Sequence, residues 1–120
     1  MDAELRIRDA LIAAIRKLPD KAERLIHKAA AEETHPSGQL VLNAIEENIK
    51  VSAETGLPLC QDTGMFWCLA SIGRDSGVSM AKVEDVVIHG AGMAAVDGFY
   101  RKSVVCDPVY SRVNTGTNLP

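Results

Sequence analysis

The sequence predicts an α/β or α+β fold that is mostly helical and contains a small sheet. Apolar residues recur at helical spacing over most of the chain, which favours helices. One short apolar run, "MFWCLASI" at residues 65–72, lies between two glycines and has the length and composition of a buried strand. The length of 120 residues suits one small domain, whose core must be mainly aliphatic because only 4% of the residues are aromatic.

The first two helices are expected over residues 3–18 and 20–33. Pro19 is expected to end the first helix, because proline cannot continue a helical hydrogen-bond ladder. Asp20 is the expected N-cap of the second helix, since Glu23 follows three residues later and completes the pattern of a capping box. The apolar stripe of the first helix consists of Leu5, Leu11, Ile12, Ile15 and Leu18.

The third helix is expected over residues 38–54, with Ser37 as its N-cap and Gly56 as its terminator. Its apolar residues cover a wide face, which indicates contact with more than one layer of protein. After the predicted strand and a short turn, a fourth helix is expected over residues 80–96. Gly98 is expected to end it, and the polar residues near the C-terminus are typical of a loop.

Charge and hydropathy exclude several classes of protein. The net charge is −3 with no block of like charges, which argues against nucleic acid or an anionic membrane as the main partner. No apolar run approaches the roughly 20 residues of a membrane span, and the N-terminus "MDAELRIRDA" lacks the apolar core of a signal peptide. We therefore expect a cytoplasmic protein.

The chain has three cysteines and no CxxC pair. In a reducing compartment such thiols bind metal or react more often than they form disulfides. Cys68 lies inside the apolar run and is predicted to be a small core residue, and Cys106 is also interpreted as structural. Only Cys60 has neighbours suited to chemistry.

Cys60 opens the sequence "CQDTG" directly before the predicted strand. Gln61 offers both a donor and an acceptor, Asp62 can accept a proton or orient a base, and Gly64 lets the backbone approach a ligand. A thiolate held after the turn at Pro58 would be rigid and could still face a cleft. The alternative is a polar helix-to-strand turn with a buried thiol, which local chemistry alone favours.

Two further segments could bind an anion. Arg101, in "FYRKS", is suited to grip a carboxylate through two parallel hydrogen bonds, and the alternative is a surface charge like Lys102. The run "NTGTNLP" can present hydroxyls, amides and backbone N–H groups to an anion, although the same residue types are typical of a turn. This run places Asn114, Thr115, Thr117 and Asn118 around Gly116.

Taken together and in this order, "PLCQDTG", "DGFYRKSVVCDP" and "VNTGTNLP" resemble class I fumarate hydratase, the iron–sulfur fumarase family. The related L-tartrate dehydratase alpha subunit shares the first motif. The resemblance covers nearly the whole chain, and the form "NTGTNLP" looks more like fumarase than tartrate dehydratase.

The resemblance implies a hydro-lyase that reversibly adds water to fumarate to give malate. The family holds a 4Fe-4S cluster through three cysteines, and its open iron binds substrate oxygens as a Lewis acid. By position, Cys60 matches the first cluster cysteine, and Arg101 matches an arginine that holds a substrate carboxylate. Gln61 and Asp62 match residues at the substrate, with Asp62 also in the proton-transfer network and therefore catalytic. A possible active-site loop comprises Asn114, Thr115, Gly116 and Thr117.

The sequence departs from the family pattern at Pro120, which lies inside a motif that continues in relatives. In the family the other two cluster cysteines come later, and Cys68 and Cys106 do not match ligand positions. We therefore expect residues 1–120 to be the N-terminal part of an iron–sulfur hydro-lyase alpha domain, inactive alone. The expected partners are the remainder of the alpha region, a beta subunit or C-terminal domain, a dicarboxylate substrate, and a second copy in a dimer of the full enzyme.

Two alternatives stay open. The chain could be the same segment of an L-tartrate dehydratase or a related hydroxy-acid dehydratase, which substrate assays on the complete enzyme would distinguish. It could also be a non-catalytic binding or assembly domain that has kept only the fold. That alternative predicts apolar faces closed on themselves, and the wide apolar face of the third helix argues against it.

Overall fold

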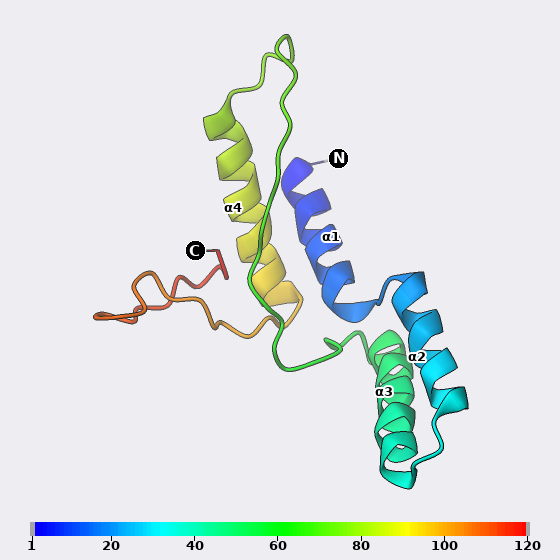
Figure 1. Ribbon diagram of the computed structural model, residues 1–120. Helices are drawn as coiled ribbons and strands as arrows, with labels where there is room; N and C mark the ends of the chain where they lie inside the picture. The colour runs from blue at the N-terminus through cyan, green and yellow to red at the C-terminus, as the bar shows by residue number, and fades with distance from the viewer. Residues whose placement is uncertain (1, 120) are drawn as a thin grey trace. The chain divides into compact units, whose positions relative to one another are not determined.

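The computed structural model describes residues 2–119, and its regular structure is helical (Figure 1). The helices are α1 (Ala3–Arg16), α2 (Asp20–Glu32), α3 (Pro36–Thr55) and α4 (Met80–Asp97). All four predicted helices are confirmed, and each end lies within two residues of its predicted position. None of the helices in the described part of the chain is long and apolar enough to cross a bilayer.

The helix caps differ in part from the prediction. Pro19, not Asp20, is the N-cap of α2, and no side chain accepts a capping hydrogen bond there. The N-cap of α3 is His35, not Ser37; its Nδ1 accepts from the Ser37 backbone N–H at 3.2 Å. Both corrections have one cause, since proline fits the end of a helix and displaces the boundary: Pro19 precedes α2 and Pro36 begins α3.

Gly56 ends α3 as predicted. Its φ of 70° lies in the left-handed region, and its N–H donates to the carbonyl of Ser52. Glycine adopts this conformation without the steric cost that a Cβ would bring, so the residue fits the end of the helix. Gly98 likewise follows α4, although in the right-handed region.

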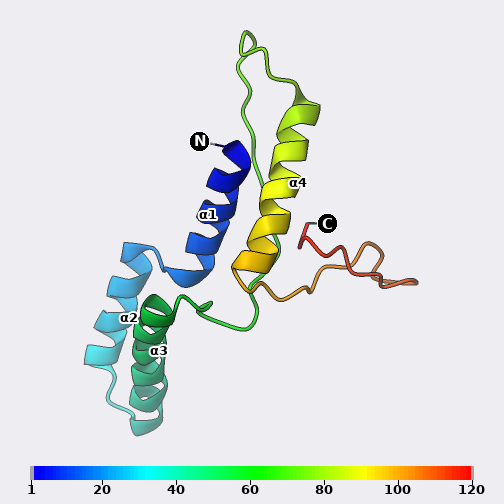
Figure 2. The ribbon, with the colours of Figure 1, turned by 180° about the vertical axis from the view of Figure 1, so that it is seen from behind.

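The chain divides into two compact units. The first, which we call the helical unit, is Ala13–Cys60. Within it α2 and α3 lie side by side and run in opposite directions (Figure 1 and Figure 2). Its buried residue is polar: Ser52 is 2% exposed, and its hydroxyl lies 2.6 Å from the carbonyl oxygen of Leu57 and 3.2 Å from that of Arg16. Apolar side chains on α2 and α3 stay exposed, including Leu25, Leu40 and Val41.

The second unit, which we call the loop unit, joins the chain up to Ile12 with the chain from Gln61 onward. Its core is built on α4, where the small residues Ala91, Ala94 and Ala95 are buried. Phe66 and Tyr100 are buried as well, and their rings meet edge to face with centroids 4.7 Å apart.

Close contact between α1 and α4 in the loop unit depends on Gly90. A Cβ built on Gly90 would lie 2.8 Å from the Cβ of Ile7 and 2.9 Å from the carbonyl oxygen of Glu4. Carbon atoms in contact sit about 3.5–4.0 Å apart, so no side chain fits there without displacing α1. A glycine at this position is therefore what lets the two helices meet.

The predicted small sheet is not confirmed. Residues 65–72 are extended but belong to no strand, and the pairing found among residues 2–119 is an isolated antiparallel bridge between Val105 and Asn114. A strand requires a neighbour along its backbone. The backbone bond of this segment within the described residues runs from the Phe66 N–H to the carbonyl of Asn118, at 3.0 Å.

Candidate functional site

Asn118 joins the three sequence motifs within the loop unit. Its side chain is fully buried, and its amide nitrogen donates to the carbonyl of Arg101 at 2.8 Å and to the carbonyl of Gly64 at 3.3 Å. Its amide oxygen accepts from the Ser103 backbone N–H at 3.3 Å. The Asn118 side chain therefore binds backbone groups that lie 15 to 54 positions before it in the sequence.

A second bond joins "CQDTG" to "FYRKS". The backbone N–H of Arg101 donates to the hydroxyl oxygen of Thr63 at 2.9 Å. Thr63 immediately follows Asp62, and the Asp62 carboxylate accepts from the Gly64 N–H at 3.4 Å. The main chain of the predicted carboxylate-binding arginine thus lies beside the loop that carries Gln61 and Asp62, and all three of these side chains are exposed.

The residues of "NTGTNLP" are hydrogen-bonded to backbone carbonyls of the segment that follows Arg101. The Asn114 amide nitrogen donates to the carbonyl of Lys102 at 2.8 Å, and its amide oxygen accepts from the Gly116 N–H at 2.7 Å. The Thr115 N–H donates to the carbonyl of Val104 at 2.9 Å. This loop is thereby fixed to the segment that follows Arg101.

A tight turn at Asp107 lies between the segment that follows Arg101 and the loop that begins at Asn114. The Asp107 carboxylate accepts from the backbone N–H groups of Val109, Tyr110 and Ser111 at 2.9–3.2 Å. These hydrogen bonds lower the pKa of Asp107 below its ordinary value, because they favour the charged carboxylate. The bond from the Val109 N–H has the largest effect. The sequence analysis did not single out Asp107, although an aspartate before a proline is a common start of a turn.

Cys60 is the last residue of the helical unit and directly precedes Gln61. The residue before it is anchored on both sides: the Leu59 N–H donates to the carbonyl of Ile15 at 2.8 Å, and the Leu59 carbonyl accepts from the Asn48 amide at 2.6 Å. Cys60 itself is exposed. The sulfur is thus carried by a backbone that two helices hold, and it is not the buried thiol of the alternative interpretation.

The other two cysteines do not join Cys60 in a ligand cluster. Within residues 2–119 no group of three or more His, Cys, Asp or Glu side chains could hold a metal ion. The described residues therefore do not fit a complete iron–sulfur site, which needs several thiolates around one cluster. The prediction that Cys68 is a core residue is wrong, because its side chain is exposed, as is that of Cys106.

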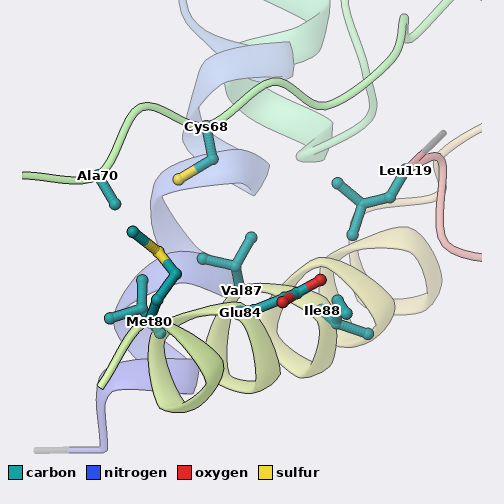
Figure 3. Close-up of a pocket in the computed structure, with 8 residues that line it drawn as sticks. Cys68, Ala70, Met80, Glu84, Val87, Ile88 and Leu119 are labelled. Carbon is teal, nitrogen blue, oxygen red and sulfur yellow. The ribbon is translucent and has the colours of Figure 1, made fainter. Parts of the chain in front are cut away.

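Cys68 instead lines an open, mostly apolar pocket of about 320 Å³ in the loop unit. Figure 3 shows the Cys68 and Leu119 side chains pointing toward α4, where Val87 and Ile88 form the floor. Glu84 is its one charged lining residue. The predicted site residues do not line this pocket, which touches the candidate site only through Leu119, the neighbour of Asn118.

Comparison of the sequence with known families identifies the family of this chain. Residues 4–120 match the family model described as fumarate hydratase (Fumerase). The chain belongs to this fumarate hydratase family. The match includes all three motifs that Asn118 and Thr63 bring together.

Two curated proteins are similar to this chain. A Methanocaldococcus jannaschii protein named "Putative L(+)-tartrate dehydratase subunit alpha" is 28% identical over 97% of the chain. A Geobacillus stearothermophilus protein named "Putative fumarate hydratase class I" is 32% identical over 86% of the chain. The chain spans 43% of the length of the first relative and 20% of the length of the second.

Asn118 is the residue whose importance the sequence analysis missed, since the predicted active-site loop ended at Thr117. An asparagine in a polar, glycine-containing run is typical of a turn, and nothing local distinguishes a buried one. Its φ of 56° is compatible with that local interpretation. The contacts that give it a different role come from residues 15 to 54 positions away.

Proposed function

We propose that this chain forms the N-terminal part of an iron–sulfur hydro-lyase that reversibly hydrates fumarate to malate. The observation that carries the proposal is the convergence of "CQDTG", "FYRKS" and "NTGTNLP" on Asn118 and Thr63. Turn-forming segments with unrelated roles have no reason to share one buried amide. A binding site built from three separate segments does require such a connection.

The exposed side chains on this framework suit a dicarboxylate. The Arg101 guanidinium can hold one carboxylate through two parallel hydrogen bonds, a geometry that lysine does not offer. The Gln61 amide can donate to a second oxygen. The Asp62 carboxylate can take up or return the proton that moves during hydration, provided that it lies within hydrogen-bond reach of the substrate.

The loop of Asn114, Thr115, Gly116 and Thr117 is proposed to line the same site. Thr115 and Gly116 use their backbone N–H groups within the fold, while the hydroxyl of Thr117 lies near the Leu119 N–H at 3.4 Å. The hydroxyl of Thr115 is similarly 3.4 Å from the Thr117 N–H. These are long contacts, so both hydroxyls can turn toward a bound anion at little cost.

Cys60 is the proposed thiolate ligand of a 4Fe-4S cluster. One thiolate cannot hold such a cluster, so we propose that the other ligands come from the remainder of the alpha region. A beta subunit or C-terminal domain is the further proposed partner, and the chain is proposed to be inactive without them. That the curated relatives are longer than this chain supports the proposal.

Dehydration of L-tartrate or a related hydroxy acid is the second candidate. One relative, aligned with 97% of this chain, is named a tartrate dehydratase subunit, which supports L-tartrate as the substrate. The same Arg101, Gln61 and Asp62 would serve either reaction, because both substrates are four-carbon dicarboxylates. Substrate assays on the complete enzyme distinguish the two.

Anaerobic iron–sulfur reconstitution tests the proposal. It is carried out on this chain alone and on this chain combined with the protein encoded immediately downstream, and is followed by absorbance and by fumarate hydration. We expect a cluster and activity only in the combined sample. The Cys60→Ser variant should lose both, whereas Cys106→Ser, a matched substitution at another exposed cysteine, should keep both.

Two results would contradict the proposal. A combined sample that binds no cluster would leave only the family fold in common with the hydro-lyases. A combined sample that keeps full cluster content in Cys60→Ser would remove Cys60 from the ligand set.

A further inference from the structure

We propose that Asn118 is a positioning residue of the hydro-lyase site, which sets the place of Arg101 relative to the loop of Gln61 and Asp62. This inference rests on the proposed function, because it concerns how that site holds a dicarboxylate. Asn118 itself is buried and would not touch the substrate. Its effect would pass through the main chains that it binds.

The Asn118 side chain makes three hydrogen bonds within the fold. A carboxamide has two N–H donors, and both meet carbonyls, at Arg101 and at Gly64. The amide oxygen accepts from Ser103, two residues after Arg101. One rigid, planar group therefore binds the main chain at Arg101 and Ser103 and at the end of "CQDTG".

The backbone of Asn118 reinforces the same connection. Its carbonyl accepts from the Phe66 N–H, two residues after Gly64. The Phe66 ring packs on the ring of Tyr100, the residue before Arg101. The arginine and the "CQDTG" loop are thus linked through Asn118 and, independently, through an aromatic contact next to it.

The Arg101 side chain is exposed, so its direction depends on the main chain that carries it. The Arg101 N–H is bonded to Thr63 and its carbonyl is bonded to Asn118. A catalytic arrangement loses rate steeply when a binding group moves by about 1 Å, by as much as about 100-fold. Removing the Asn118 amide frees the carbonyl of Arg101 and should let the guanidinium move away from the position that grips a carboxylate.

The test compares Asn118→Gly with Ala91→Gly in the complete reconstituted enzyme. Glycine keeps the positive φ of residue 118 without strain and removes only the amide. Ala91 is buried on α4, so Ala91→Gly is expected to destabilise the loop unit while it leaves the hydrogen bonds of Asn118 in place. We expect Asn118→Gly to raise the KM for fumarate about tenfold or more, and Ala91→Gly to leave KM unchanged.

Hydrogen exchange of the Arg101 and Phe66 amides provides a second readout. In Asn118→Gly both amides should exchange faster than in the wild type, while in Ala91→Gly their protection should fall no more than that of the other amides of the loop unit. Provided that the wild-type enzyme is active, two results for Asn118→Gly would overturn the inference. One is an unchanged KM; the other is a loss of active-enzyme concentration alone, as expected for Ala91→Gly. A wild-type complex that hydrates no dicarboxylate would instead overturn the proposed function, and with it the role of Asn118 in that site.

Discussion

The helical unit and the loop unit are stabilised in different ways. In the helical unit two antiparallel helices meet along exposed and half-buried faces, and Ser52 is its fully buried residue among those described. Among the described residues of the loop unit, five apolar residues are buried, and side chains bind backbone groups far away in the sequence. The Tyr100 hydroxyl, for example, donates to the carbonyl of Leu11 at 2.7 Å, across 89 positions.

This difference separates structure that is specified by neighbouring residues from structure that is specified by residues far apart in the sequence. A helix and its apolar face are specified by residues three and four positions apart, so a short window of sequence contains most of what is needed to predict them. Loops that converge on a buried polar group are specified by partners that no window contains. The candidate site belongs mostly to the second kind, and the predictions below test that contrast.

The largest effect is expected from the contact between α1 and α4. Gly90→Ala should lower the free energy of unfolding of the loop unit by about 1–3 kcal/mol, because the added methyl group overlaps Ile7 and the Glu4 backbone. Urea unfolding followed by circular dichroism measures the change.

Gly92→Ala is the matched control on the same helix. A Cβ at Gly92 would meet only the Thr117 methyl group, at an ordinary 3.9 Å. Alanine has the higher helix propensity, so this variant should be more stable than the wild type by about 0.5–1 kcal/mol. Equal effects of the two substitutions would mean that α1 does not rest on Gly90.

A smaller effect is expected from the buried hydroxyl of the helical unit. Ser52→Ala should cost about 1 kcal/mol of stability, because it removes the donor that meets the carbonyls of Leu57 and Arg16. Ser37→Ala, at an exposed position of α3, should change stability by less than about 0.5 kcal/mol. If thermal unfolding showed the same midpoint for both variants, Ser52 would not hold the end of α3.

The smallest effect is expected from His27, which lies between two carboxylates of the helical unit. Its Nδ1 is hydrogen-bonded to Glu46 and its Nε2 lies 3.7 Å from Glu23. The bond to Glu46, more than the charge of Glu23, raises the pKa of His27 above its ordinary 6.5. The stabilisation is therefore fully present below pH 6.5 and is lost as the pH rises through the raised pKa of the folded state.

Titration of His27 by NMR measures this directly. In Glu46→Gln the pKa of His27 should fall, and the loss of stability above pH 6.5 should become smaller. Glu47→Gln is the matched control, since Glu47 pairs with Lys50 at 3.9 Å instead. An unchanged His27 pKa in Glu46→Gln would show that the pair does not form in solution.

The helices could be predicted from the sequence because their apolar spacing repeats within each element. Their caps were predicted less well, since prolines at residues 19 and 36 decide the boundaries in place of the polar residues Asp20 and Ser37. The apolar run at residues 65–72 was predicted to be a strand on composition. Composition indicates burial, but strand formation also requires a partner that a sequence pattern does not name.

The motifs themselves could be identified from the sequence, but their connection could not. Nothing local distinguishes Asn118 from the asparagines of an ordinary turn, because its partners are Gly64, Arg101 and Ser103. The same limit applies to Thr63, whose hydroxyl accepts from a residue 38 positions away. Polar groups of this kind are specified by tertiary structure, because each must find a partner once it is buried.

The extended segment at residues 65–72 gives the molecule an optical reporter. Phe66 faces inward, whereas Trp67 on the opposite side is 82% exposed and is the chain's only tryptophan. Indole emission moves to shorter wavelength when the ring leaves water. Any polypeptide that covers this segment would therefore change the intrinsic fluorescence of the protein. The emission wavelength of Trp67 would then report assembly in real time, without a label.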